Sequence, residues 1–231
     1  MTLLFVHGAG CTRDIFAAQL SAFPDAHAIA LPGHDAPGGC TSIEGFADAV
    51  SSYVGERDLR DVVVFGHSMG GAVALELALR RSLWLRALVL VGSGSRLRVN
   101  AEILDGLQTD FLATTHRIAT LLFAAPTPER VTMAQAMLMQ VGARQTLDDF
   151  MACNAYDATE RLESVEVPLL ALTGDRDVMT PPKYARFLAD RVPNAQVRIL
   201  DGAGHLAMLE RPEQTNAELR TFVTSSLTEF T

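Results

Sequence analysis

A serine set between two glycines constrains the fold of this chain more than any other feature. The apolar run at residues 62–65 leads into Gly-His-Ser-Met-Gly at residues 66–70, and an alanine- and leucine-rich run follows as far as Leu79. The first run favours a β-strand and the last run favours a helix. Where a strand turns into a helix this sharply, a side chain at either glycine would collide with neighbouring backbone. The pattern therefore predicts a strand-to-helix turn that projects the hydroxyl of Ser68 above the end of a strand.

A serine hydroxyl is a weak nucleophile at neutral pH. An active Ser68 therefore needs a histidine base, an acid that orients this base, and N–H donors for an oxyanion. A strand-like run at residues 196–200 leads into a glycine-rich loop that carries His205. Since His205 has both a suitable loop and the required place in the chain order, we expect it to be the base.

Two aspartates are candidates for the orienting acid. The apolar run at residues 168–173 ends in Gly-Asp-Arg-Asp at residues 174–177. Acids placed directly after a buried strand lie at the edge of a parallel sheet where reactive groups collect. Both Asp175 and Asp177 satisfy the chain order serine, acid, histidine that this type of turn requires. The residues themselves therefore leave the choice between them open.

These motifs, together with His-Gly-Ala-Gly at residues 7–10 and Leu-Pro-Gly-His at residues 31–34, resemble the α/β-hydrolase fold superfamily. The resemblance extends over essentially the whole chain and implies a capped, esterase- or lipase-like serine enzyme. In that superfamily the second acid of a Gly-x-x-Asp run usually completes the triad. The resemblance thus implies that Asp177 is the acid, with Asp175 as the alternative.

The resemblance also implies an oxyanion hole made of backbone N–H groups. The matching positions are Ala9, after the His-Gly pair, and Met69, after the serine; their side chains matter little because the N–H does the work. We expect the histidines beside these turns, His7 and His67, to pack or to form hydrogen bonds rather than to catalyse. His34 lies in a proline- and glycine-containing turn and is expected to have no chemical role.

Strand-like and helical runs alternate along most of the chain, which predicts an α/β fold with a mostly parallel sheet of about six strands and helices on both faces. By the superfamily's usual count an N-terminal hairpin is missing, so the run at residues 27–31 should form an exposed edge of the sheet. The expected strands are residues 3–7, 27–31, 62–67, 87–92, 168–173 and 196–200, and the expected helices are residues 13–22, 42–56, 70–81, 182–192 and 212–226.

The alternation stops between residues 94 and 165, a segment too long for a plain loop. Helical patterns at residues 100–114, 115–124, 128–141 and 146–156 predict a helical cap. We therefore expect an α/β-hydrolase core made of residues 1–94 and 165–231, with a cap insertion at residues 95–164. The methionines of this segment suit an adaptable apolar lining and favour an acyl or aryl group. Candidates for the pocket wall are Met133, Met137, Phe111 and Phe123.

Composition excludes several other classes of function. A chain of 231 residues with a net charge of −8 lacks the basic surface that nucleic acids and anionic membranes require. Three widely spaced cysteines favour neither a disulfide framework nor a zinc site, so no metal is expected. The N-terminal run lacks a basic leader, which predicts a cytoplasmic protein with no membrane insertion. Either a monomer or a homodimer formed through the exposed sheet edge is consistent with the sequence.

The sequence thus predicts a carboxylesterase-like serine hydrolase that cleaves small to medium apolar esters without any cofactor. Ser68 attacks the ester carbonyl, His205 transfers the proton, and Asp177 orients His205. The same triad would also serve a lactonase, a thioesterase, a carbon–carbon bond hydrolase or a synthase of the menaquinone-pathway type. A ligand-sensing receptor of the same fold is the alternative from a different class.

Overall fold

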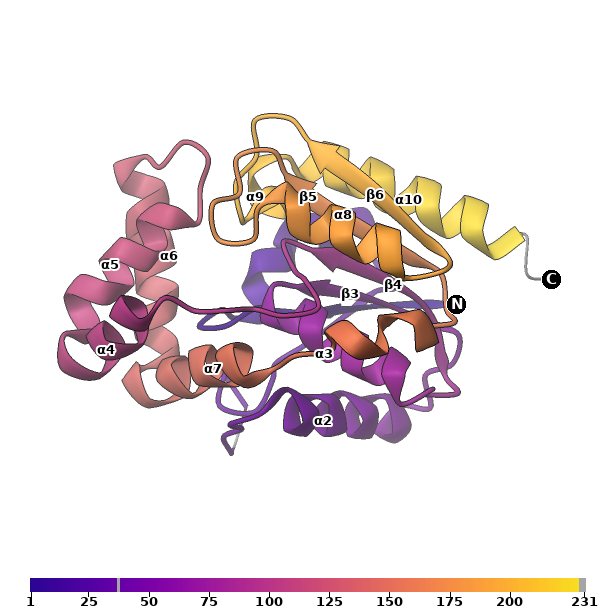
Figure 1. The fold of residues 1–231 in the computed structure, drawn as a ribbon, viewed down its shortest axis with the longest axis horizontal. Coiled ribbons are helices and arrows are strands. Elements are labelled where there is room, and N and C mark those ends of the chain that lie inside the picture. Colours follow the sequence, from indigo (N-terminus) through magenta and orange to yellow (C-terminus); the bar gives the residue numbers. More distant parts are fainter. Residues whose placement is uncertain (37, 229–231) are drawn as a thin grey trace.

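The computed structural model describes residues 1–36 and 38–228 and has one six-stranded sheet at its centre (Figure 1). The strand order is β2-β1-β3-β4-β5-β6, and every pairing is parallel. The expected parallel sheet of six strands is therefore confirmed. The strands are β1 (Thr2–Val6), β2 (His27–Ile29), β3 (Val62–His67), β4 (Leu85–Val91), β5 (Leu169–Gly174) and β6 (Ala195–Leu200).

Helices cover both faces of this sheet because its side chains alternate between two cores. Along β3, Val62 and Val64 belong to one buried cluster, whereas Val63 and Phe65 belong to the other. The first cluster includes side chains of α2 (Ile43–Glu56), α3 (Met69–Leu79) and α8 (Pro182–Arg191). The second includes side chains of the short helix η1 (Arg13–Phe16), α9 (Ala207–Glu210) and α10 (Pro212–Thr228). Helix α1 (Ala17–Ala22) continues directly from η1.

A helical insertion follows β4 and extends from one end of the sheet, at the left of Figure 1. It comprises α4 (Ala101–Thr109), α5 (Phe111–Leu121), α6 (Pro128–Val141) and α7 (Ala143–Ala155), and a short helix η2 (Thr159–Ser164) leads back to the sheet. The break between α4 and α5 lies at Asp110, earlier than the sequence pattern indicates. Asp110 ends α4 and caps α5, because its carboxylate accepts a hydrogen bond from the N–H of Ala113.

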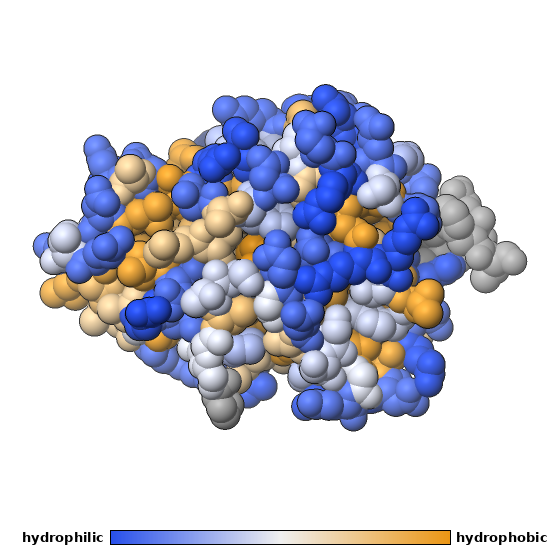
Figure 2. Space-filling model, turned by 60° about the horizontal axis from the view of Figure 1, so that its bottom comes forward, coloured by the Kyte–Doolittle hydropathy of each residue, from blue (hydrophilic) through white to orange (hydrophobic). Residues whose placement is uncertain are grey.

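Apolar residues are exposed on the surface of the insertion, as Figure 2 shows at the same end of the molecule. Several of its large side chains are substantially exposed: Leu112, Leu121, Met133, Met139 and Met151.

Within residues 1–36 and 38–228, no helix is both long enough and apolar enough to cross a lipid bilayer. The expected sheet edge is confirmed, since β2 pairs with β1 on one side and is terminal in the strand order.

Candidate active site

Ser68 occupies the sharp turn that the sequence predicts between β3 and α3. Its φ of 50° is positive, a region that non-glycine residues rarely adopt. The turn closes tightly, because a Cβ at Gly66 would meet the backbone of Gly70 and a Cβ at Gly70 would meet the carbonyl of Val6. Its backbone is held by hydrogen bonds from Ser68 N–H to Val91 and from the Ser93 hydroxyl to the Ser68 carbonyl, at 2.9 and 2.8 Å. The strain in this backbone is therefore supported by its surroundings.

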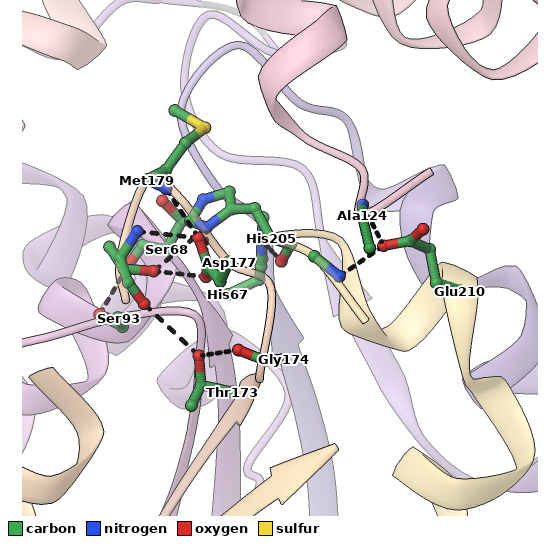
Figure 3. Close-up of polar contacts among 12 residues, drawn as sticks. His67, Ser68, Ser93, Ala124, Thr173, Gly174, Asp177, Met179, His205 and Glu210 are labelled. Atoms are coloured by element: carbon green, nitrogen blue, oxygen red, sulfur yellow. Dashed lines mark hydrogen bonds and ion pairs between the residues drawn. The ribbon is translucent and has the colours of Figure 1, made fainter. Parts of the chain in front are cut away.

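His205 and Asp177 form a buried hydrogen-bonded pair (Figure 3). The Nδ1 atom of His205 lies 2.9 Å from Oδ2 of Asp177, and both side chains are almost fully inaccessible to solvent. The Thr180 hydroxyl donates to the same carboxylate oxygen at 2.7 Å and lies 3.1 Å from His205 Nδ1. This arrangement places the Nδ1 proton of His205 between two acceptors. The Nε2 atom is thus left free to accept a proton.

The carboxylate of Asp177 is kept ionised by its neighbours. Burial alone would raise its pKa, but the adjacent His205 and the hydrogen bonds from Thr180 outweigh this effect and hold the pKa below its usual value. The N–H groups of Met179 and Thr180 donate to its Oδ1 atom at 2.9 and 2.8 Å. Asp175, the rival acid, is exposed and instead accepts a hydrogen bond from the N–H of Gly202 at 2.7 Å. The geometry therefore brings Asp177, and not Asp175, to the ring of His205.

Ser68, His205 and Ala9 line one cavity, whose wall is otherwise mainly apolar. The helices of the insertion and their ends contribute six side chains to it: Ile118, Leu122, Met137, Leu138, Phe150 and Cys153. The segment between β4 and α4 adds Leu97, Arg98 and Val99. Of the four candidates that the sequence offered, Met137 lines this cavity, whereas Met133 is half exposed at 49%. Phe111 and Phe123 pack into the hydrophobic core beside it and are absent from its lining.

The loop that carries Ala9 is held from its back by His7. The carbonyl of Gly8 accepts hydrogen bonds from His7 Nδ1 at 3.1 Å and from the N–H of Cys11 at 3.2 Å. The other ring nitrogen of His7 accepts from the N–H of Leu31 at 3.2 Å. Burial, and secondarily the neighbouring His34, lowers the pKa of His7 to about 3, so its ring is neutral. Met69, the second expected donor, follows Ser68 as the first residue of α3.

His67 supports the opposite side of the site. Its Nε2 lies 3.1 Å from the carbonyl of His205, and the two rings are 4.9 Å apart. Burial is the main cause that lowers the pKa of His67 to about 3, with a further contribution from His205. A neutral His67 can therefore donate from Nε2 and fix the backbone of His205. The expectation that His7 and His67 form hydrogen bonds agrees with these contacts.

A buried carboxylate, Glu210, ties the histidine loop to the insertion, as Figure 3 shows. Its Oε2 accepts from the N–H of Gly204 at 2.6 Å and from the N–H of Ala124 at 3.1 Å, and its Oε1 lies 3.1 Å from the Arg130 guanidinium. The sequence analysis missed Glu210, as it missed Thr180 and Ser93. In the sequence the only signal for Glu210 is its position shortly after His205, and that spacing is not distinctive.

Two cysteines of the cavity wall, Cys11 and Cys153, are free thiols. Burial, with the nearby Asp149 as a second cause, raises the pKa of Cys11 to about 12 and also raises that of Cys153. Both are therefore protonated and unreactive at neutral pH. Within residues 1–36 and 38–228, no three histidine, cysteine or acidic side chains gather as metal ligands would.

Comparison with known proteins places these observations in context. The model of the alpha/beta hydrolase family matches residues 3–218. A pimeloyl-(acyl-carrier protein) methyl ester esterase of Neisseria meningitidis is 29% identical, over 97% of this chain and 77% of its own length. The solved structure of a thermophilic esterase is 30% identical with a TM-score of 0.90, covering 97% of this chain and 90% of that one. Est816, an N-acyl homoserine lactone degrading enzyme, is 25% identical with a TM-score of 0.87, covering 96% and 93%.

Proposed function

The chain belongs to the alpha/beta hydrolase family, and we propose that it is a carboxylesterase-like serine hydrolase acting on small to medium apolar esters. One observation carries the proposal: Ser68 and His205 line the same cavity, and the Nδ1 atom of His205 is hydrogen-bonded to the buried carboxylate of Asp177. A base that is oriented in this way, beside a serine on a strained turn, suits acyl transfer. The similar esterases support the class of reaction.

The proposed mechanism uses five groups of the chain. Ser68 Oγ attacks the ester carbonyl while His205 Nε2 takes its proton, and Asp177 stabilises the imidazolium that forms. The N–H groups of Ala9 and Met69 bind the tetrahedral oxyanion. The intermediate collapses as His205 gives its proton to the leaving alcohol, which leaves an acyl group on Ser68. Water, deprotonated by His205, then attacks this acyl group and releases the carboxylic acid and the free serine.

The insertion, in this proposal, is a cap that sets substrate preference. Its cavity-lining residues are mainly apolar, with Arg98 as the charged exception, and the same cavity is lined by Ser68 and His205. When an acyl chain packs against this wall, water is removed from the apolar surfaces of both the chain and the wall, which favours binding by about 0.8 kcal/mol for each methylene. The wall therefore suits an aliphatic or aryl acyl group rather than a sugar. In this proposal the cap is residues 95–164, and the core is residues 1–94 together with residues 165–231.

A lactonase is the second candidate, because the similar Est816 degrades N-acyl homoserine lactones. A lactone is a cyclic ester, so the same groups would open it without any change in mechanism. The two candidates differ in what the cavity accepts. Rates on a homologous series of p-nitrophenyl esters, compared with rates on N-acyl homoserine lactones of the same acyl length, would distinguish them.

The test of the mechanism is the variant Ser68→Ala. Removing the nucleophile should lower kcat by roughly a thousandfold or more on p-nitrophenyl butyrate, while the protein remains folded by circular dichroism. A matched control is Ser95→Ala, since the Ser95 hydroxyl is buried but contacts Thr159 rather than the cavity. This control should retain activity within about twofold. Esterase activity of folded Ser68→Ala close to that of the wild type would refute the mechanism, and a wild type that binds esters without cleaving them would indicate a sensor.

A further inference from the structure

We propose that Asp149, a residue of the insertion, is a positioning residue for the loop that supplies the oxyanion donor Ala9. The inference rests on the proposed function, since it concerns the same site. Asp149 lies on α7, and its side chain is completely buried. It touches neither Ser68 nor His205 in any recorded hydrogen bond, so any effect on catalysis must pass through the loop.

The first observation is a hydrogen bond between the insertion and the loop. The Oδ2 atom of Asp149 accepts from the N–H of Gly10 at 2.8 Å, across 139 positions of sequence. Gly10 follows Ala9 directly and has a φ of +61°, a conformation that glycine adopts readily. The other carboxylate oxygen, Oδ1, accepts from Gln145 Nε2 at 2.8 Å, which fixes the carboxylate plane. A buried, doubly anchored carboxylate is a firm acceptor for a backbone N–H.

The second observation is a histidine ring beside the same carboxylate oxygen. His34 Nε2 lies 2.7 Å from the same Oδ2 atom, and His34 Nδ1 lies 3.1 Å from the carbonyl of Pro32. His34 and Asp149 thus form a buried hydrogen-bonded pair, and His34 is anchored at its other ring nitrogen by the backbone of Pro32.

The pair acts on the loop from two sides. The rings of His34 and His7 are 4.7 Å apart, and after burial His34 is the second cause that lowers the pKa of His7. Neutral His7 donates from Nδ1 to the carbonyl of Gly8. That carbonyl and the N–H of Ala9 belong to one trans peptide and point in opposite directions. Holding the Gly8 carbonyl at the back therefore aims the Ala9 N–H toward the front, while Asp149 fixes the next peptide through Gly10.

Gly10 N–H is taken up by Asp149, which leaves Ala9 as the donor that this loop presents to the cavity.

The experiment compares Asp149→Asn with a matched control, Glu76→Gln. Glu76 is also buried and bonded to arginines, Arg80 and Arg161, but it lies away from the cavity. For Asp149→Asn we expect kcat on p-nitrophenyl butyrate to fall about ten- to a hundredfold with KM changed less than threefold, because the oxyanion exists only after the attack. The affinity for a trifluoromethyl ketone, which forms an oxyanion with serine, should fall by a similar factor. Glu76→Gln should lower the melting temperature but leave kcat within twofold.

The inference would be overturned by a folded Asp149→Asn with kcat near that of the wild type, or by an equal loss of kcat in Glu76→Gln. Should Asp149→Asn not fold, His34→Gln decides the matter. It removes the rigid ring whose two nitrogens contact Asp149 and the carbonyl of Pro32, so Asp149 loses an anchor and kcat should fall about tenfold at unchanged KM. An unchanged kcat would overturn the inference. An inactive wild type would instead refute the proposed function, and this inference with it.

Discussion

At the scale of single residues, burial and hydrogen-bond partners decide which side chains can take part in the site, even between residues of the same type. Asp175 and Asp177 are the same residue type two positions apart on one loop. The first is exposed and bonds the N–H of Gly202, whereas the second is buried and receives four hydrogen bonds, from Met179, Thr180 twice and His205. His205 and the hydrogen bonds from Thr180 lower the pKa of the Asp177 carboxyl, although burial opposes this.

The two aspartates give a direct test of the proposed triad. Asp177→Asn should lower kcat by on the order of ten thousandfold, because an amide facing His205 Nδ1 favours the wrong tautomer of the ring. Asp175→Asn, the matched control, should lose less than about threefold, since an amide oxygen can still accept from Gly202. Steady-state rates on p-nitrophenyl butyrate measure both. If Asp175→Asn proved the more damaging variant in folded protein, the acid would have been assigned to the wrong residue.

The residues that the sequence identified share one property. Ser68, Asp177 and His205 each lie in a local pattern, a turn that contains glycine and directly follows a strand, although only the resemblance to the family favoured Asp177 over Asp175. Asp149 and Glu210 lie in no such pattern. Their partners, Gly10 and Ala124, are 139 and 86 positions away, and only the packing of the insertion against the core brings them together. Contacts of this kind cannot be predicted from spacing along one chain.

At the scale of elements, buried carboxylates join the insertion to two loops of the candidate site. Asp149 joins α7 to the loop of Ala9 and Gly10, and Glu210 joins the loop of His205 to the segment after α5. The helical character of this region was predictable from apolar spacing. Which of its apolar residues face the cavity was not, because one helix buries several faces. On α6, Leu138 and Met137 line the cavity, whereas Met133 is exposed.

This difference between two methionines of one helix tests the cap proposal. Met137→Ala should enlarge the apolar wall and move the preferred acyl length upward by one or two carbons. Each added methylene that is buried should raise kcat/KM about fourfold, which corresponds to about 0.8 kcal/mol. Met133→Ala, the control, should leave the profile unchanged. The measurement is kcat/KM across p-nitrophenyl esters from acetate to decanoate.

The rate on the acetate should be nearly the same in both variants, because so short an acyl group does not reach the wall. A profile that is flat in the wild type and in Met137→Ala would contradict the proposal that the insertion selects chain length. It would leave the triad proposal intact, since Met137 contributes no reacting group.

At the scale of the whole molecule, the parallel sheet gathers three loops at the carboxyl ends of its strands, and this end contains buried, neutral histidines. The sequence predicted the sheet because strands buried on both faces read as continuous apolar runs. It could not predict the protonation state of His7 and His67, which depends on burial by elements from across the fold. Both have their pKa lowered to about 3, mainly by burial. In the folded protein His7 and His67 therefore remain neutral at pH values at which the unfolded chain would bind a proton at each of them.

This difference in protonation predicts that stability falls as the pH is lowered. Between the unfolded pKa of about 6.5 and the folded pKa of about 3, the unfolded chain binds a proton at His67 that the native protein does not, so the free energy of unfolding rises with pH. The contribution is fully present above pH 6.5 and is lost as the pH falls toward 3. At pH 5 the loss amounts to roughly 2 kcal/mol for this residue.

The variant His67→Gln isolates this effect. Its amide can still donate to the carbonyl of His205, but it does not titrate. Urea unfolding between pH 5 and pH 8 should therefore show a shallower pH dependence for the variant, by close to one proton at the acid end. His116→Gln is the control, because His116 is exposed and its removal should leave the slope unchanged. Equal slopes for wild type and His67→Gln would mean that His67 takes up its proton within the folded protein, and that burial does not hold this histidine, which precedes Ser68, in the neutral form.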